Sequence, residues 1–501
     1  MDLEKIIRTI SPEWAYKRAK ADTRVQRIYD AGTLGHHQHK DPLSPNFSAD
    51  AVLDHARSNL RNWARYLDEN HDLAVGILDS LTDAVVGSGL VWEPMVKTGG
   101  RQGALHKPTN DRLRQLWNRY WEYPEVSREH TGHQIERLIC RSWLRDGEVF
   151  VHHLEGRVSG LQHWSAVPYS LELLEADLLP WDLIDDRVQT GNKIIHGVEK
   201  GAWQEPLAYW FFREHPGNSP LLSGITASFQ DLTRVRAQDI SHIKFVRRLG
   251  QTRGVTVLHA VIQRLDDLKD LEEAERIAAK VAASLTAAIT KSVDADLGAE
   301  DIDSVMADRS FYMKPGMVAD SLLPGEDVSV IKSERPNPDL IEFRADQLRA
   351  VASGTGASYS TISKRYDGSY SSQRQELVEN QPQFERIRSY FCELFAKPIW
   401  DRFVRLAVTS GQLPTPALLD FESLSAVNVR QSGGIPWIDP QKEVQADLAA
   451  IQGRLTSRRE IIRKRGGDPD LIDAEIELDP PMQPETENDA PPRADESDEA
   501  A

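Results

Sequence analysis

Cysteine is scarce in this sequence. Its 501 residues include only Cys140 and Cys392. Two distant cysteines outside any CxxC spacing cannot build a disulfide framework or a cysteine-ligated zinc site. We therefore interpret each one as a small, buried apolar residue, and the pattern favours a protein of a reducing compartment.

Long apolar runs are also missing. No stretch of about 18 consecutive apolar residues occurs, which is the length that a membrane-spanning helix needs. The first twenty residues, MDLEKIIRTISPEWAYKRAK, lack the apolar centre of a secretory signal. The sequence therefore predicts neither a membrane span nor a signal peptide.

The chain has no excess of positive charge. It carries 60 Lys and Arg against 77 Asp and Glu, which gives a net charge of -17. Tight wrapping of nucleic acid depends on many cationic contacts with phosphate, so this balance argues against it. The negative charge is still compatible with an acidic passage through which DNA slides, because strong cationic contacts would slow the duplex. Residues 479–501 contain eight acids and one base, and we expect a disordered tail there.

Recognisable catalytic motifs are lacking as well. The glycines of SGTGAS, residues 353–358, are not followed by GK[ST], and no HExxH, GxSxG or spaced carboxylate cluster occurs. His36, His37 and His39 have no nearby acid or cysteine to complete a metal site, so we interpret them as a solvated loop. The sequence predicts no catalytic residues, no cofactor, no metal and no enzymatic activity.

The feature around which the rest is organised is the stretch 253–292. It has no proline, and no glycine after Gly254, and its apolar residues recur at steps of three and four. This periodicity predicts one long helix. Alanine dominates its second half, and small side chains let neighbouring helices approach from several sides. Such a helix is either buried in a large domain or packed against copies of itself in an oligomer.

The remaining patterns predict an α+β chain that is mainly helical. Helical periodicity covers most of residues 48–147, with Ser48 or Asp50 as the first cap, and alternation typical of strands follows over 148–252. A mixed segment with two expected strands follows the long helix, and a helix ends at the glycines 354 and 356. The next segment is polar, and we interpret it as a loop. A long helix from about 372 to 410 is expected to break or kink at Pro382 and Pro398.

Three short helices are expected near the C-terminus. Pro440 suits a first helical position, Ser457 with Glu460 fits a capping box, and Asp468 starts the last helix. This region also contains a group of cationic residues, which either form a solvated helix face or meet phosphate: Arg454, Arg458, Arg459, Arg463, Lys464 and Arg465.

The order of these patterns resembles the portal proteins of tailed bacteriophages, and among them the lambda-type family. The resemblance extends over roughly residues 20–475, and its segments occur in the family's order. They are SPNFSADAVLDHARSNLRNWARYLDENHDLAVGILDSLTDAVVGSGL, WLRDGEVFV, RRLGQTRGVTVLHAVIQRLDDL, SLLPGEDVSVIKSERPNPDLIEF, LRAVASGTGASYSTISKRYDGSYSSQR and PWIDPQKEVQADLAAIQGRLTSRREI.

The resemblance implies the portal fold, in which wing, stem, clip and crown assemble as a ring around a central channel. By order along the chain, the implied parts are an extended N-terminal arm (1–47), a helical part of the wing (48–147), a β-rich part of the wing (148–252), a first stem helix (253–292), a clip (293–335), a second stem helix (336–356), a tunnel loop (357–371), a wing helix with the following segment (372–435), a crown (436–478) and an acidic tail (479–501).

The resemblance also implies a function. The expected ring, typically a dodecamer, stands at the special vertex of a virion capsid, where DNA is packaged by terminase and later ejected. The implied partners are double-stranded DNA, the large terminase subunit, head-tail connector or adaptor proteins, and the major capsid and scaffold proteins, with assembly in the cytoplasm of the bacterial host. Two alternatives stay open, namely another structural head or connector protein, and a metal-dependent DNA-processing enzyme of the packaging apparatus.

The implied site residues fall in three groups. Lys364 and Arg365 would contact DNA from the tunnel loop, and the cationic residues of the crown would contact it inside the capsid. The third group would pack between subunits in the stem: Ala278, Ala279, Ala282, Ala283 and Leu285.

Overall fold

The computed structural model describes residues 48–98, 103–185, 192–218, 229–284, 288–291, 326–329, 339–366, 368–414, 420–433 and 440–479. The expected N-terminal arm, most of the expected clip with its first strand, and nearly all of the acidic tail lie outside these ranges. Side chains are described from 48 to 280, with short gaps, and again from 339.

Four helices form the N-terminal part, as the periodicity predicts. Ser48 caps the first by accepting a hydrogen bond from the Ala51 amide at 3.2 Å. The fourth is capped by Thr131 and Gln134 and ends at Gly147, whose φ of +87° suits glycine. Their bounds are α3 Ala49–Asn70, α4 Asp72–Val85, α5 Lys107–Trp121 and α6 Gly132–Asp146.

Antiparallel strands follow, in two sheets with the orders β3-β2-β8 and β4-β5-β6-β7. A further pair joins β1 to β11, which come from opposite ends of the chain. The strands are β1 Leu90–Pro94, β2 Glu148–Glu155, β3 Tyr169–Leu174, β4 Lys193–Ile195, β5 Val198–Lys200, β6 Pro206–Phe212, β7 Leu232–Arg236, β8 Ile240–Lys244 and β11 Val427–Gln431.

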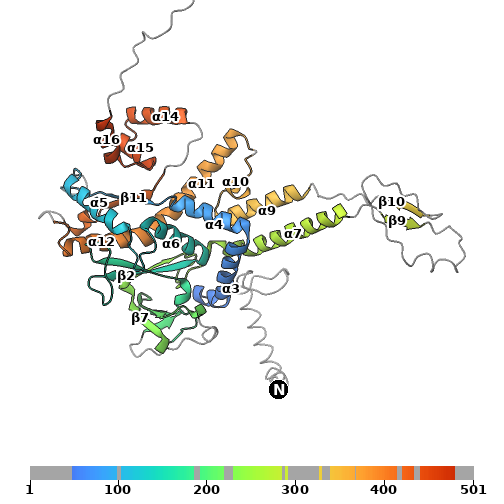
Figure 1. Cartoon of the computed structure of the whole chain (residues 1–501), viewed down its shortest axis with the longest axis horizontal. Coiled ribbons are helices and arrows are strands. Elements are labelled where there is room, and N and C mark those ends of the chain that lie inside the picture. The colour runs from blue at the N-terminus through green and yellow to red at the C-terminus, as the bar shows by residue number, and fades with distance from the viewer. Residues whose placement is uncertain are drawn as a thin grey trace, which may run out of the picture.

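Two antiparallel helices extend from this body, α7 Ile262–Ser284 and α9 Asp339–Thr355 (Figure 1). Their antiparallel orientation follows from two hydrogen bonds at 2.5 Å, one from Arg264 to Gln347 and one from Arg344 to Glu272. Beyond their far ends, strand β9 Ala288–Lys291 pairs with β10 Glu326–Ser329.

The predicted single helix over 253–292 needs correction. The chain first forms a 3-10 turn, Val257–Ala260, and α7 then starts at Ile262. At the other end, residues 288–291 are a strand. The β-branched Ile289 and Thr290 lie in this strand, and β-branched side chains suit extended backbone. The second of the two strands predicted after the helix, VSVIK, overlaps β10.

A fully buried ion pair joins the β-rich part to the start of this arm. The Arg253 guanidinium donates to both carboxylate oxygens of Glu148, at 2.8 and 2.9 Å, and to three backbone carbonyls. Glu148 also accepts from the Gly254 amide at 2.9 Å and contacts His242 at 3.0 Å. Burial acts to raise the pKa of Glu148, but Arg253 and His242 outweigh it and hold the pKa well below its usual value.

The long C-terminal helix is interrupted next to the second of the two prolines but not at the first. Helix α11, Tyr370–Phe391, continues through Pro382, and a π-helical turn, Cys392–Ala396, then leads into α12, Lys397–Thr409. Pro398 stands in the first turn of α12 and has no amide hydrogen to donate to residue 394, which lies in the π turn. The interruption therefore comes from the wider π turn, whose Phe395 and Ala396 are buried in the main core.

That main core gathers aromatic residues from distant segments. Trp92 of β1, Trp117 and Trp121 of α5, and Trp400 and Phe403 of α12 pack with ring centroids between 4.4 and 6.2 Å apart. These contacts hold α12 against β1 and α5, because each ring buries a large apolar area.

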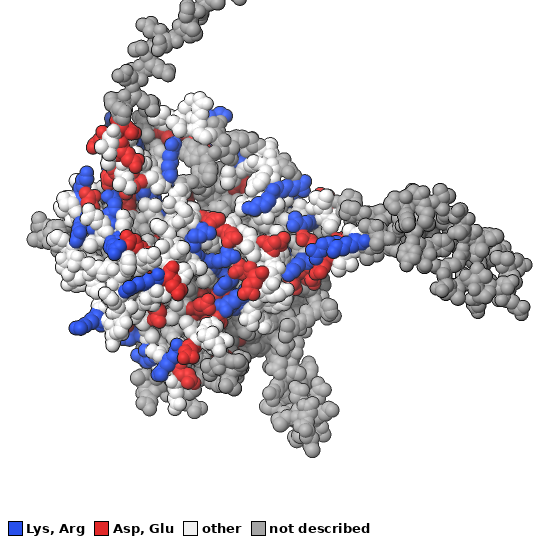
Figure 2. Space-filling model, in the orientation of Figure 1, with Lys and Arg blue, Asp and Glu red and all other residues white. Residues whose placement is uncertain are grey.

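The last described segment, 440–479, forms three short helices, as predicted: α14 Pro440–Gln452, α15 Arg458–Lys464 and α16 Pro469–Leu478. Acidic and basic side chains are intermixed over the visible face of the body (Figure 2). Among the described residues, no helix combines the length and apolar character needed to cross a bilayer.

Candidate functional site

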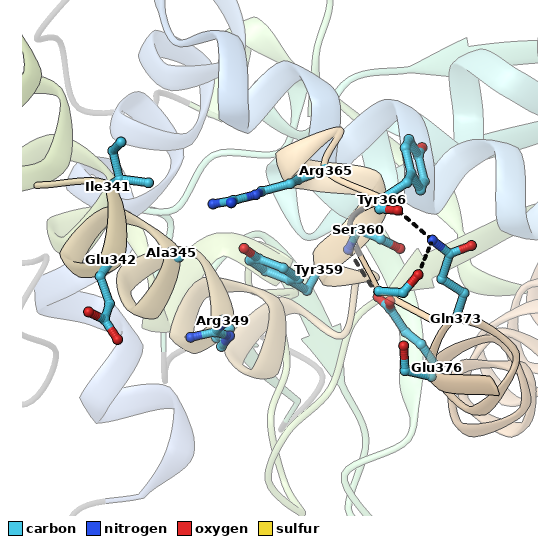
Figure 3. Close-up of a pocket in the computed structure, with 12 residues that line it drawn as sticks. Ile341, Glu342, Ala345, Arg349, Tyr359, Ser360, Arg365, Tyr366, Gln373 and Glu376 are labelled. Carbon is cyan, nitrogen blue, oxygen red and sulfur yellow. Dashed lines mark hydrogen bonds between the residues drawn. The ribbon is translucent and has the colours of Figure 1, made fainter. Parts of the chain in front are cut away.

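Of the two expected DNA-contacting residues, Arg365 lines a hollow between α9, the short helix α10 Tyr359–Ser363 and the start of α11, and Lys364 directly precedes it in the chain (Figure 3). The hollow has a volume of about 690 Å³. Its lining combines two arginines, two tyrosines, two glutamates and a glutamine with small and apolar residues: Ile341, Glu342, Ala345, Arg349, Tyr359, Ser360, Arg365, Tyr366, Gly368, Ser372, Gln373 and Glu376.

Two glycines lie at the end of α9, where the chain turns towards α10. Gly356 follows α9 with a φ of +78°, and a Cβ there would lie 1.4 Å from the Gln383 side chain. Gly354, still within α9, lies so close to Val261 that a Cβ would come within 2.6 Å of it. A side chain at Gly356 would therefore be strained by the left-handed backbone, and one at Gly354 would press against Val261.

Glu376 of α11 holds the start of α10 in place. Its carboxylate accepts hydrogen bonds from the Ser358 hydroxyl at 2.5 Å and from the Ser360 amide at 3.0 Å. Burial acts to raise the pKa of Glu376, but these hydrogen bonds outweigh it and lower the pKa. The carboxylate consequently stays ionised at neutral pH and keeps accepting from this turn.

The segment 357–371 is more ordered than the loop that its polar composition predicts. It contains α10, and α11 begins at Tyr370, where Ser369 accepts from the Ser372 amide at 3.3 Å. The Gln373 side chain donates to the carbonyl oxygens of Tyr366 and Gly368, at 2.7 and 3.2 Å. The Glu376 carboxylate thus accepts from the first turn of α10, and residues that look loop-like when taken singly form a short helix.

Lys364 ends α10 in a left-handed conformation with a φ of +53°, and its side chain is exposed. Arg365 is also exposed, and its amide donates to the Ser363 hydroxyl at 3.3 Å. In Figure 3 the Arg365 side chain extends into the hollow above Tyr359, which carries the Arg349 guanidinium 5.2 Å from its ring centre. Two adjacent cations are therefore presented at the surface, one of them over the hollow.

Most of the cationic residues expected in the crown form ion pairs with carboxylates. Arg458 pairs with Asp473, Arg459 with Asp470, Arg463 with Glu93, and Arg465 with Asp447. Arg454 and Lys464 are exposed, and neither forms an ion pair within the described part of the chain. The cluster is thus largely neutralised in the single chain.

The expected stem contacts lie at the far end of α7. Ala278 and Ala279 are half-buried, whereas the side chains of Ala282 and Ala283 are not among those described and Leu285 lies outside the described ranges.

One group of described residues has the geometry of a metal site. A carboxylate oxygen each from Glu175 and Asp177 and a nitrogen of His215 lie within 4.8 Å of one another. Asp177, however, already pairs with Arg61 at 2.7 Å and with Arg65 at 2.5 Å. These two guanidinium groups supply the positive charge that the carboxylate needs, so the group is accounted for as part of an ion-pair network.

Two residues of the site were not indicated by the sequence. Glu376 looks like an ordinary exposed acid of α11, and Arg349 like an exposed base of α9. Their roles depend on the folding of α9, α10 and α11 against one another. The sequence contains one signal for the role of Glu376, because a carboxylate a short distance after a serine-rich turn is a candidate cap for that turn.

Comparison with known proteins identifies the family. The model of the phage portal proteins of the lambda family matches residues 37–388. The chain belongs to this family. A probable portal protein of Halomonas phage phiHAP-1 is 26% identical over 338 residues, which cover 67% of this chain and 63% of that protein. The alignment therefore spans less than two thirds of that relative's length.

Two further comparisons extend over more of the chain. The portal protein of Escherichia phage N15 is 24% identical over 473 residues, or 85% of this chain and 84% of that protein. Among solved structures, a chain from the neck of a native gene transfer agent particle, computed with C12 symmetry, is 14% identical with a TM-score of 0.42. That alignment covers 82% of this chain and 94% of the neck chain.

This portal protein is accordingly a structural component of a phage particle.

Proposed function

We propose that copies of this portal protein form a closed ring at one vertex of the capsid. DNA enters the capsid through the central channel, driven by terminase, and leaves through it during ejection, and head-tail connector proteins attach to the ring. Membership of the lambda portal family is the observation that carries this proposal.

The elongated arm of α7 and α9 fits such a ring. The two helices extend from the body as an antiparallel pair, with the β9–β10 pair beyond their far ends (Figure 1). Side-by-side packing of these arms around an axis would build the stem, and β9 with β10 would belong to the clip that faces terminase. The small side chains of Ala278 and Ala279, near the end of α7, would allow close approach of a neighbouring helix.

In this ring, Lys364 and Arg365 would contact the DNA backbone transiently. Both are exposed at the end of α10, on a turn that Glu376 and Gln373 fix to α11. A few cations on each copy bind phosphate weakly, and each exposed contact is screened by salt, so the duplex can move past them. The anchored turn would hold these cations at a constant distance from the DNA.

Charge reversal tests this role. The double variant Lys364→Glu and Arg365→Glu should form rings of unchanged mass but package or retain less DNA, measured as nuclease-protected DNA per particle. The matched control reverses two exposed cations of the β-rich part, Arg157 and Arg213, and should package normally. If the Lys364 and Arg365 variant packages as much DNA as the control variant, these two residues do not have this role. If the purified chain stays monomeric under assembly conditions, the proposed ring is wrong.

A further inference from the structure

Charged groups attach the C-terminal unit, which consists of α14, α15 and α16 (residues 440–479), to the rest of the chain. The Arg463 guanidinium contacts both carboxylate oxygens of Glu93, with distances of 3.0 and 3.2 Å from its Nε. Arg114 of α5 pairs with Asp468 at 3.2 Å. None of the residues of the unit belongs to the hydrophobic clusters of the described structure. Polar contacts therefore hold the unit on the body, and it has no share in the apolar core.

An open cleft of about 640 Å³ lies between this unit and the body. Helix α16 lies above α5 in the view of Figure 1, and the cleft is found where the two meet. Three tryptophans, Trp92, Trp117 and Trp121, line it on the side of the body, and Leu471 of α16 lines the other side. Leu471 is 56% exposed, so the described residues do not fill the cleft. The cleft therefore offers aromatic and aliphatic walls to a ligand.

Two hydrogen-bond donors in the lining have no partner within the described ranges. Trp117 and Asn118 are adjacent on α5, and neither the indole N–H of Trp117 nor the side-chain amide of Asn118 donates to another described residue. By contrast, the indole N–H groups of Trp92 and Trp121 donate to the buried Glu136 carboxylate at 2.9 and 3.2 Å. Unused donors beside aromatic walls suit a ligand that combines apolar rings with unpaired carbonyl oxygens.

A proline-rich segment has this combination of properties. Polyproline II backbone forms no internal hydrogen bonds, so its carbonyl oxygens stay available, and aromatic-lined grooves are a recurrent way to bind PxxP segments. Residues 480–484, which lie outside the described ranges, read PPMQP and have PxxP spacing from Pro481 to Pro484. The segment carries no charge, so the mixed charges that line the cleft, Arg114 with Glu122 and Asp468, do not exclude it.

The segment is also long enough to reach the cleft. Helix α16 ends at Leu478, and Leu471 lies seven residues earlier, about 10 Å away along the helix axis. Residues 479–484 span up to about 19 Å in the polyproline II conformation, which rises about 3.1 Å per residue. A chain that turns back after Leu478 can therefore bring both ends of the PxxP segment beside Leu471.

We propose that residues 480–484 bind in the cleft of their own chain and strap the C-terminal unit to the body. Pro481 and Pro484 pack against the tryptophans and Leu471, and carbonyl oxygens of the segment accept from Trp117 and Asn118. The bound segment adds apolar area to an attachment that otherwise depends on ion pairs. This inference concerns the single chain and does not depend on the proposed ring.

Thiol labelling of the full-length chain tests the docking. Ser88→Cys places a thiol in the lining of the cleft with little change in size, and Ser159→Cys places a control thiol at an exposed position outside it. The native thiols react slowly, because burial raises the pKa of Cys140 and raises that of Cys392 to about 12. The two introduced thiols therefore dominate the labelling by maleimide.

The prolines are then replaced in pairs. In the dissociated Ser88→Cys chain, Pro481→Ser with Pro484→Ser should speed labelling by about tenfold, equivalent to ~1.4 kcal/mol of lost protection, because the segment no longer covers the thiol. The matched control, Pro491→Ser with Pro492→Ser further along the tail, should leave the rate unchanged. The Ser159→Cys thiol should label at one rate in all these chains.

A synthetic peptide of residues 479–486 identifies the ligand directly. At about 1 mM, the effective concentration that a short tether provides, it should slow labelling again in the chain that lacks Pro481 and Pro484, whereas the same peptide with serine at both positions should not. Equal labelling rates with and without the two prolines, or equal effects of the two peptides, would overturn the inference. Protection that appears only after assembly into rings would also overturn it, because the segment would then come from a neighbouring copy.

Discussion

Replacing Arg253 by Met should destabilise the protein more than most single substitutions. Met retains much of the side-chain volume but removes the cation from a carboxylate that is fully buried, because Glu148 and Arg253 are both inaccessible to solvent. Removing one partner of a buried ion pair costs about 3–5 kcal/mol, since the other charge is left uncompensated. Three backbone carbonyls, those of residues 176, 179 and 196, also lose their donor.

The measurement is thermal unfolding of the dissociated chain, followed by circular dichroism. At roughly 2–4 °C per kcal/mol for a domain of 150–250 residues, the melting temperature should fall by about 10 °C. Arg276→Met is the matched control, because Arg276 and Glu273 are exposed and 3.7 Å apart. An exposed pair of this kind contributes about 0–1 kcal/mol. Adding Glu148→Leu to the Arg253 variant should recover part of the loss, since no charge is then left buried.

The effect should also depend on pH. In the wild type the folded-state pKa of Glu148 is lowered, so its contribution to stability is present above the unfolded pKa of about 4.3 and is lost as pH falls below it. Without Arg253, burial dominates and the pKa rises, so protonation relieves the penalty. The difference between variant and wild type should therefore shrink from pH 7 to pH 5. An equal difference at both pH values, or a change no larger than that of the control, would refute this account.

Two further predictions concern packing and capping. Gly254→Ala should destabilise the fold by more than about 1 kcal/mol, because its Cβ would lie 1.9 Å from a backbone carbonyl oxygen, whereas Gly76→Ala, with open space in α4, should stabilise it by about 0.5–1 kcal/mol in the same melting assay. Glu376→Ala should free the turn of α10 and speed tryptic cleavage after Lys364, while Glu379→Ala, an exposed acid of α11, should leave the cleavage rate unchanged.

Local signals predicted the parts of the fold that depend on neighbouring residues. Ser48 caps α3, Ser457 caps α15 and Asp468 caps α16, as their positions before helical runs indicate. The alternation in EVFVHHLEG likewise predicted β2. Each of these features involves residues within a few positions of one another, so a single sequence contains the information.

Features that depend on distant residues were not accessible in this way. Strands β1 and β11 pair residues such as Trp92 and Val429, more than 300 positions apart, and each strand is too short to show clear alternation. The burial of Arg253 follows from the convergence of β2, β8 and the backbone near residue 179. The ion pair of Arg463 was missed for the same reason, because its carboxylate partner, Glu93, comes from β1.

Two ion pairs, one that joins the helical arm to the body and one that joins the C-terminal unit to it, differ in how strongly salt screens them. The Glu148–Arg253 pair is fully buried directly before the turn that leads into α7, so dissolved ions screen it much less than an exposed pair. The Arg114–Asp468 pair is only partly buried, with exposed fractions of 19% and 11%, and little apolar area supports it. Salt therefore weakens the attachment of the C-terminal unit before it weakens that of the arm. The proposed docking of residues 480–484 would add apolar area at this end, which the described contacts lack.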